Sequence, residues 1–364
     1  MTEPIRTAVW GTGNVGRAAI RAVHAHPDLE LCDVLVADPA KVGRDAGDLA
    51  GLAGSLGVAA TDDVASVLER GPDAVVYAAS GDLRPDDAVA DVRRCLGVGA
   101  VVVTPSIYAL YDPTSAPGEL VGPVRDAARS GGGALFVSGI DPGWANDLLP
   151  VLVSGLAGTV ERIRCQEVFD YSTYDQPDSV RHLVGMGEAM DTTPPMVAPG
   201  VPTMVWGGQV RLIARALGVT LDEVTEHVER RPLERTVVNS MGEFAEGGQG
   251  ALRFEVRGVV GGEPVIVVEH VTRIDPRCAP DWPVPTSGDG THRVVIEGRP
   301  RIEVDIEATD EGGNRAAGGN ATAVGRLVNA IPWLRAAEPG IYDALDVPLL
   351  PARGKLAAHR TAGG

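Results

Sequence analysis

Residues 5–20 read IRTAVWGTGNVGRAAI, and this stretch decides the fold. A short apolar run breaks off into the spacing G-x-G-x-x-G, and a helix-like pattern follows. Gly11 permits a tight turn, Gly13 lets a pyrophosphate approach the backbone, and Gly16 lets the helix pack close to the strand. The free N–H groups at the start of the helix face the phosphates. The stretch predicts a dinucleotide-binding turn formed by Gly11, Thr12, Gly13, Asn14, Val15 and Gly16.

The size and composition of the chain fit a globular protein with two domains. Its 364 residues are 44% hydrophobic and 22% charged, and a domain usually takes about 100–200 residues. The net charge of −17 argues against a nucleic acid or an anionic membrane as partner. We therefore expect a small-molecule substrate and neither of these partners.

Cysteine usage and the N-terminus predict a cytoplasmic protein. The four cysteines are scattered without C-x-x-C pairing, and the seven histidines form no H-x-x-x-H pair. This usage favours free thiols and supports neither a disulfide framework nor a metal site. The N-terminus enters a strand at once, which predicts no signal peptide. No apolar run approaches the roughly 20 residues that span a bilayer.

Regular alternation of strands and helices follows the glycine turn. Apolar runs predict four more strands, at 29–37, 74–79, 100–103 and 134–137. Helical patterns fall between them, at 64–69, 85–96 and 123–130. Such alternation is typical of a doubly wound parallel sheet with α/β architecture.

An acidic residue ends the second predicted strand. Asp38 lies 22 positions after Gly16, close to the roughly 20 expected for the acid that binds the adenosine ribose. A carboxylate there repels a 2′-phosphate and favours NAD over NADP. Lys41 and Arg44 follow closely and can instead reach a phosphate. Asp38 on its own also fits a turn cap before Pro39, and the glycine motif favours the cofactor role.

Two further strand ends supply candidate walls for the nicotinamide and its ribose. In a doubly wound fold the ligand lies at the carboxyl ends of the strands. Five residues are expected there: Ala79, Ser80, Gly81, Thr104 and Pro105.

The second half of the chain changes pattern after about residue 145. Alternating apolar and polar residues predict an antiparallel sheet with one solvated face, with strands at 160–169, 250–260, 263–271, 292–297 and 300–308. Helices are predicted at 179–189, 205–217 and 221–230. A last apolar helix at 320–331, ended by Pro332, is expected to return to the first domain.

Four stretches carry a resemblance to a known family: the glycine motif, 42–47 (VGRDAG), 139–143 (GIDPG) and 323–341 (AVGRLVNAIPWLRAAEPGI). The chain resembles the dihydrodipicolinate-reductase-like oxidoreductases, and among them the native amine dehydrogenases and 2,4-diaminopentanoate dehydrogenase. The resemblance implies a Rossmann domain of residues 1–145 with 318–352 and an α+β substrate and dimerisation domain of residues 146–317. It also implies a homodimer, NAD or NADP as cofactor, and hydride transfer at an imine carbon.

The chain departs from this family at one place. The resemblance implies a catalytic glutamate just after the strand that ends at Thr104, where it handles ammonia and the proton transfers. Here residues 106–111 read SIYALY, and the first acid is Asp112.

Several residues are candidates for the proton transfer that accompanies hydride transfer. Tyr108 and Tyr111 lie in the loop that carries catalysis in the family, and Asp141 precedes Pro-Gly at a sheet end. Some candidates also have a structural explanation. Asp141 fits an Asx-turn, the polar segment 170–175 fits an exposed loop, and His182 fits an isolated surface histidine. The candidates are Tyr108, Tyr111, Asp141, Tyr171, Tyr174, Asp175 and His182.

The sequence therefore predicts an NAD(P)-dependent oxidoreductase that transfers hydride to or from a small C=N or C=O compound. One alternative is a true amine dehydrogenase that takes its carboxylate from Asp141 or Asp112. Another is a non-catalytic sensor that binds NAD(P) and has lost the acid.

Overall fold

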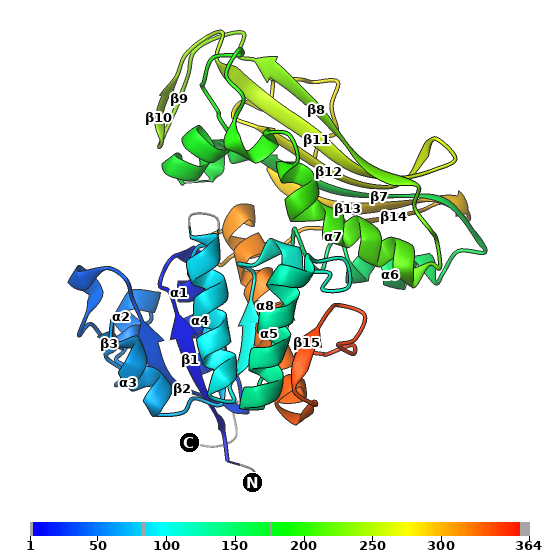
Figure 1. The fold of residues 1–364 in the computed structure, drawn as a ribbon. Helices are drawn as coiled ribbons and strands as arrows, with labels where there is room; N and C mark the ends of the chain where they lie inside the picture. The colour runs from blue at the N-terminus through cyan, green and yellow to red at the C-terminus, as the bar shows by residue number, and fades with distance from the viewer. Residues whose placement is uncertain (1–2, 82–83, 175, 357–364) are drawn as a thin grey trace. The chain divides into compact units, whose positions relative to one another are not determined.

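The computed structural model describes residues 3–81, 84–174 and 176–356, which form two compact units (Figure 1). The first unit runs to Ile140 and resumes at Asn320, and the second unit comprises Asp141–Gly319. Asp141 thus belongs to the second unit, although the predicted boundary at residue 145 put it in the first. Its side chain bonds to a helix of the second unit, Trp206 Nε1 donating to Oδ1 at 2.5 Å.

The first unit is built on a seven-stranded sheet in which all paired strands are parallel. The strand order is β15-β6-β5-β4-β1-β2-β3. The strands are β1 (Ile5–Trp10), β2 (Leu29–Leu35), β3 (Ala60–Thr61), β4 (Ala74–Tyr77), β5 (Val101–Thr104), β6 (Ala134–Val137) and β15 (Gly340–Tyr342). The predicted doubly wound parallel sheet is confirmed.

Helices cover both faces of this sheet. Neighbouring strand residues point to opposite faces, so Val76 packs with α1, α2 and α8, whereas Val75 packs with α3, α4 and α5. This explains why the strands are apolar at nearly every position. The helices are α1 (Asn14–His24), α2 (Ala46–Ala50), α3 (Val64–Glu69), α4 (Pro85–Gly97), α5 (Gly118–Gly131) and α8 (Arg315–Ala336).

The second unit is built on a six-stranded sheet of order β14-β13-β7-β12-β11-β8. Only β7 and β12 pair in parallel, so the sheet is mainly antiparallel, as predicted. Its strands are β7 (Thr159–Asp170), β8 (Glu223–Pro232), β11 (Gln249–Val260), β12 (Glu263–Arg273), β13 (Gly290–Arg299) and β14 (Ile302–Ile306), and a small hairpin adds β9 (Val237–Asn239) and β10 (Gly242–Phe244).

The two faces of the six-stranded sheet differ in chemistry. One face packs against α6 (Leu148–Ser154) and α7 (Val201–Ala216). Gly258 lies on this face, where an added Cβ would stand 2.7 Å from Val210 of α7. The other face carries arginines and glutamates from neighbouring strands, such as Arg253 and Glu255, in an ion-pair network.

Three predicted helices differ from the structure. Residues 221–230 do not form a helix, because Glu223–Pro232 is strand β8 and pairs along its length with β11. The predicted helix at 179–189 is reduced to the five-residue π-helix η4 (Ser179–Leu183). Helix α8 does not end at Pro332 but continues to Ala336. Pairing with a neighbouring strand overrides helical propensity at β8.

Two other sequence expectations bear on the class of protein. All four cysteines are free thiols. In the described part of the chain, no helix combines the length and the apolar character that crossing a membrane requires.

Candidate functional site

The glycine turn of the first unit has the geometry of a phosphate cradle. Gly11 has φ +109°, and a Cβ at Gly16 would stand 1.9 Å from the carbonyl oxygen of Gly11. Neither position therefore accepts a side chain. Around a Cβ added to Gly13, by contrast, no heavy atom of the described residues lies within 4 Å. Helix α1 starts at Asn14 without a side-chain cap, so its first N–H groups are available to an anion.

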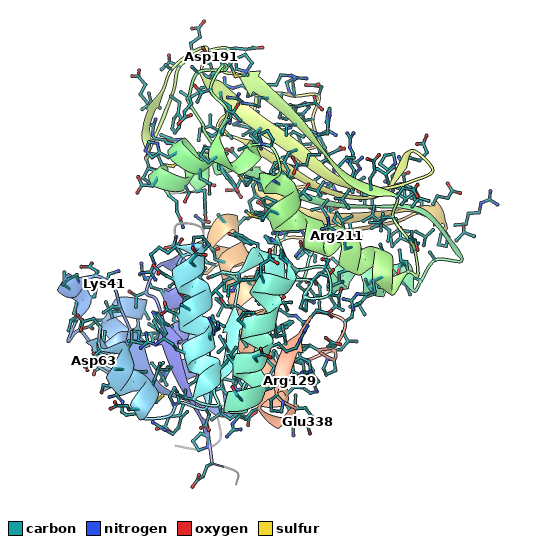
Figure 2. All side chains as sticks on the ribbon, in the orientation of Figure 1. Lys41, Asp63, Arg129, Asp191, Arg211 and Glu338 are labelled. Atoms are coloured by element: carbon teal, nitrogen blue, oxygen red, sulfur yellow. The ribbon has the colours of Figure 1, made fainter. Side chains whose placement is uncertain are left out.

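The end of β2 places both charge signs beside the turn. The Asp38 carboxylate accepts a hydrogen bond from Ala40 N at 2.9 Å and caps the short helix η1 (Pro39–Lys41). Lys41, which is labelled in Figure 2, donates from Nζ to Thr12 Oγ1 at 3.3 Å. Arg44 is exposed. One oxygen of the Asp38 carboxylate therefore caps the turn, and the other remains available to a ligand. Lys41 contacts Thr12 of the glycine motif.

The ends of β4 and β5 are joined by Ser106. Its hydroxyl donates to Ala79 O at 2.7 Å, and its N–H donates to Thr104 Oγ1 at 3.0 Å. A Cβ at Gly81 would stand 1.8 Å from Ser106 O, so glycine is required for this contact. The five predicted wall residues, which also include Ser80 and Pro105, thus lie on two adjoining loops at the carboxyl ends of the strands.

The loop after β5 places no free carboxylate at the position expected of the family. Tyr108, on η2 (Tyr108–Leu110), stacks against Tyr111 at 6.4 Å between ring centroids. Asp112 is 1% exposed, and its Oδ1 accepts from Thr114 Oγ1 at 2.6 Å. The buried position and local hydrogen bond of Asp112 describe a loop-stabilising residue.

The second unit contains a largely buried ionisable cluster centred on Glu167 of β7, which is of intermediate exposure. The strand register places His270 of β12 opposite Glu167 on one side and His292 of β13 on the other. His270 Nδ1 lies 3.5 Å from Glu167 Oε1, and His292 Nε2 lies 3.6 Å from Glu167 Oε2. The imidazoles are 3% and 7% exposed, and Glu167 is 12% exposed. Two neighbouring strands therefore hold a histidine on each side of one carboxylate.

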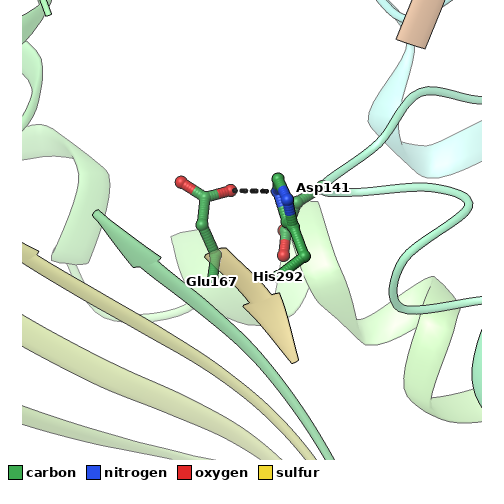
Figure 3. A group of neighbouring side chains, drawn as sticks. All are labelled: Asp141, Glu167 and His292. Atoms are coloured by element: carbon green, nitrogen blue, oxygen red, sulfur yellow. Dashed lines mark ion pairs between the residues drawn. The ribbon is translucent and has the colours of Figure 1, made fainter. Parts of the chain in front are cut away.

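Asp141 brings a second carboxylate to this cluster. Trp206 of α7 donates its indole N–H to Asp141 Oδ1 at 2.5 Å and fixes the orientation of the carboxyl group. One ligand atom each of Asp141, Glu167 and His292 lies within 4.8 Å of the others (Figure 3). Two carboxyl groups and an imidazole from three separate segments thus converge on one place.

Aromatic rings enclose the cluster. Tyr171 Oη donates to Glu167 Oε1 at 3.3 Å. His270 stacks on Phe254 at 5.0 Å and lies tilted against Trp206 at 5.9 Å. Tyr174 contacts Tyr171, with ring centroids 5.1 Å apart. Aromatic rings thus surround the cluster, and the polar atoms of Tyr171 and Trp206 donate to its two carboxyl groups.

The environment drives the pKa values of the two carboxyl groups apart. Burial and the neighbouring Glu167 charge raise the pKa of Asp141 well above its usual range. Burial also acts to raise the pKa of Glu167, but the neighbouring charges of His270 and His292 and the hydrogen bond from Tyr171 outweigh it, and that pKa is lowered. Burial lowers the pKa of His270. The pair is therefore suited to hold one proton, on Asp141, with Glu167 ionised.

The structure separates the predicted proton-transfer candidates into three groups. Asp141, Tyr171 and Tyr174 lie in or beside the cluster. Tyr108 and Tyr111 lie in the first unit, and His182 is exposed on η4 and is not part of the cluster. Asp175 lies outside the described residues. The exposed position of His182 fits the surface-histidine alternative.

Sequence reasoning missed four residues of the cluster: Glu167, His270, His292 and Trp206. Three of them interrupt predicted strands at positions that face the helix-covered side of the sheet, where apolar residues are expected. An ionisable side chain at such a position is the sequence signal that could have identified these residues. That signal does not show that His270 and His292 lie opposite Glu167 on the neighbouring strands.

The chemistry of the cluster suits a basic nitrogen compound. It pairs a protonated acid with an ionised carboxylate, the combination needed to move protons in both directions. No lysine or arginine among the described residues forms an ion pair with Glu167 or Asp141. A cationic substrate can therefore supply the missing positive charge.

Comparisons with known proteins agree with this chemistry. Residues 144–360 match the model of the 2,4-diaminopentanoate dehydrogenase C-terminal domain, and residues 5–103 match that of the dihydrodipicolinate reductase N-terminus. An amine dehydrogenase from Streptomyces virginiae is 68% identical over 97% of this chain and 98% of its own length. A 2,4-diaminopentanoate dehydrogenase from Acetoanaerobium sticklandii is 25% identical over 65% of this chain and 64% of its own length.

A solved structure shares the fold along almost the whole chain. The amine dehydrogenase from Mycobacterium smegmatis superposes with a TM-score of 0.77 and 24% identity, covering 95% of this chain and 97% of that one. At this identity the likeness extends to the architecture alone.

Proposed function

The chain belongs to the dihydrodipicolinate-reductase-like family of amine and 2,4-diaminopentanoate dehydrogenases, and we propose that it is a primary-amine dehydrogenase whose catalytic base is Glu167. As a family member it is an NAD(P)-dependent oxidoreductase that acts on an amine or imine. The observation that carries the proposal is Glu167, placed between two histidines and beside Asp141. It supplies a carboxylate in a chain that has none directly after Thr104.

In amine oxidation, Glu167 accepts a proton from the substrate ammonium group, which frees the nitrogen lone pair. That lone pair forms the C=N bond as the carbon loses hydride, which a nicotinamide cofactor held by the glycine turn at residues 11–16 would accept. Water then adds to the iminium carbon, and loss of ammonia gives the carbonyl product. The balanced reaction converts an alkylammonium ion, NAD⁺ and water into a carbonyl compound, ammonium, NADH and a proton.

Asp141 has the complementary role in the reverse direction. Reductive amination requires a proton for the hydroxyl group that leaves the carbinolamine as water. Asp141 is suited to donate it because burial and Glu167 raise its pKa. The Trp206 N–H fixes one oxygen of Asp141 and leaves the other for the proton.

We propose NAD as the cofactor. The supporting feature is Asp38, whose carboxylate stands after β2 where an adenosine ribose is bound in such folds. Lys41 favours the opposite choice, but it already contacts Thr12 at 3.3 Å. Comparing KM for NADH and NADPH in the wild type and in D38A tests the assignment: D38A should narrow the preference for NADH.

We propose that the protein acts as a homodimer, as its resemblance to the family implies. The ion-paired face of the six-stranded sheet is the surface on the second unit that a partner copy would cover. Sedimentation at micromolar concentration tests this proposal, and a monomer would contradict it.

The function is tested by ammonium-dependent oxidation of NADH with a panel of ketones and aldehydes. We expect turnover that requires both ammonium and the carbonyl compound, together with NAD⁺ reduction by the matching primary amine. Carbonyl reduction that proceeds equally well without ammonium would instead identify an alcohol-forming reductase.

A further inference from the structure

We propose that Asp141, Glu167 and His292 form a binding subsite for free ammonium, the nitrogen co-substrate of reductive amination. This inference rests on the proposed function and names the residues that hold the incoming nitrogen. It assigns a ligand role to His292, a residue with no part in the proton transfers described above.

The spacing of the three side chains fits one nitrogen. Three atoms that all lie within 4.8 Å of one another share a point no farther than about 2.8 Å from each, the length of a charge-assisted N–H···O bond. An ammonium ion at that point donates to both carboxyl groups and to His292. Transfer of one ammonium proton to the ionised Glu167 carboxylate leaves ammonia, whose freed lone pair attacks the carbonyl carbon.

Buried nitrogen atoms in the cluster require a partner. Within the described part of the chain, His292 Nε2 and both ring nitrogens of His270 have no hydrogen-bond partner. The 3.6 Å separation of His292 Nε2 from Glu167 is longer than a hydrogen bond. Buried polar atoms are nearly always satisfied, so these atoms indicate a small polar ligand. His292 accepts from ammonium when its ring proton is on Nδ1.

The charge and the walls of the subsite favour a nitrogen cation. Glu167 is ionised, because the histidines and Tyr171 lower its pKa. The rings of Tyr171 and Trp206 belong to the same enclosure, and aromatic faces attract ammonium groups. The donor set of two carboxyl groups and one imidazole is also compatible with a divalent metal ion, and the test below includes that outcome.

The test is the KM for ammonium in His292→Phe at saturating carbonyl compound and NADH. Phenylalanine keeps the edge-on contact with Phe169 (centroids 5.2 Å apart) and removes the acceptor. We expect the KM for ammonium to rise about tenfold or more while the KM for the carbonyl compound changes less than twofold. His292→Gln restores an acceptor and should recover part of the loss. His227→Phe, the same substitution at a half-exposed histidine of β8, is the matched control and should leave both KM values unchanged.

A binding measurement separates this inference from the proposed function. Ammonium chloride should raise the Tm of the wild type more than sodium chloride does, and His292→Phe should abolish the difference. This result supports the subsite even if no carbonyl compound is aminated. An unchanged KM for ammonium in His292→Phe overturns the inference. So does a stoichiometric divalent metal in the purified protein whose removal by a chelator abolishes activity.

Discussion

Two glutamates of the same sheet, Glu167 and Glu255, have opposite surroundings. Glu255 lies on the ion-paired face, 3% exposed, and is bound by Arg164 at 2.7 Å and by Arg257. Glu167 lies on the helix-covered face, where its neighbours are His270 and His292. Burial alone would raise the pKa of Glu255, but the two arginines lower it to about 2. Permanent cations make Glu255 a structural carboxylate, whereas Glu167 remains able to exchange a proton or bind a transient cation.

The largest expected effect is at Glu167. In E167Q the amide cannot accept the substrate proton, so kcat for amine oxidation should fall by about 10²–10⁴-fold, the usual contribution of a general base. The Tm should change little, because no arginine loses a partner. Steady-state kinetics and calorimetry measure both quantities. A large loss of Tm with retained kcat would make Glu167 a structural residue like Glu255.

The converse result is expected at Glu255. E255Q removes a buried carboxylate that pairs with Arg164, Arg253 and Arg257. It should lower the free energy of unfolding at pH 7 by about 3 kcal/mol, with kcat within about twofold of the wild type.

The pH dependence of that loss follows from the lowered pKa of Glu255. The stabilisation is present above the unfolded pKa of about 4.3 and is lost as the pH falls toward about 2. Denaturant titrations at pH 3 and pH 7 test this sign: E255Q and the wild type should converge at low pH, and a constant difference would argue against the charge mechanism.

The contribution of Asp141 to stability should depend on pH in the opposite direction. Its pKa is raised in the folded protein, so its contribution to stability is complete below the unfolded pKa of about 3.9 and is lost as the pH rises through the folded pKa. D141N keeps the shape but cannot ionise. The Tm of D141N minus that of the wild type should therefore increase from pH 5 to pH 9, while reductive amination is impaired. A difference that does not vary with pH would contradict the raised pKa.

The smallest effect is expected at Tyr171. Y171F removes the hydroxyl that donates to Glu167 at 3.3 Å. One such hydrogen bond contributes about 0.5–1.5 kcal/mol, so kcat should fall about two- to tenfold. Y108F, measured beside it, locates the chemistry: a larger loss in Y108F would place the proton transfer in the first unit.

The first unit was predictable because its signals are local. The glycine spacing lies within six consecutive residues, and Asp63 caps α3 by accepting from Ser66 N at 3.0 Å, close to it in sequence.

Strand β8 was predicted wrongly because its structure depends on a strand that is distant in sequence. Leu221, Val224 and Val228 recur at helical spacing among charged helix formers, and only pairing with β11, distant in sequence, makes the segment a strand.

The candidate site was only partly predictable for the same reason. Asp141 and Tyr171 stand in segments with unusual local composition, so sequence reasoning selected them. His270 and His292 each lie more than a hundred residues after Glu167 in the sequence. They come next to Glu167 because their strands pair with β7 in that register. A single sequence shows that each interrupts an apolar pattern, but the pairing of the strands is a property of the folded sheet.

The most direct test of the central role of Glu167 separates nitrogen handling from hydride transfer. Reduction of a preformed cyclic imine such as 1-pyrroline needs no ammonia, whereas amination of a ketone does. Both rates are measured with NADH in the wild type and in E167Q. The account predicts that E167Q loses ammonium-dependent amination by about 10²-fold or more and retains most of its imine reduction. Equal loss of both activities, or retention of both, would contradict the assignment of Glu167 to the substrate nitrogen.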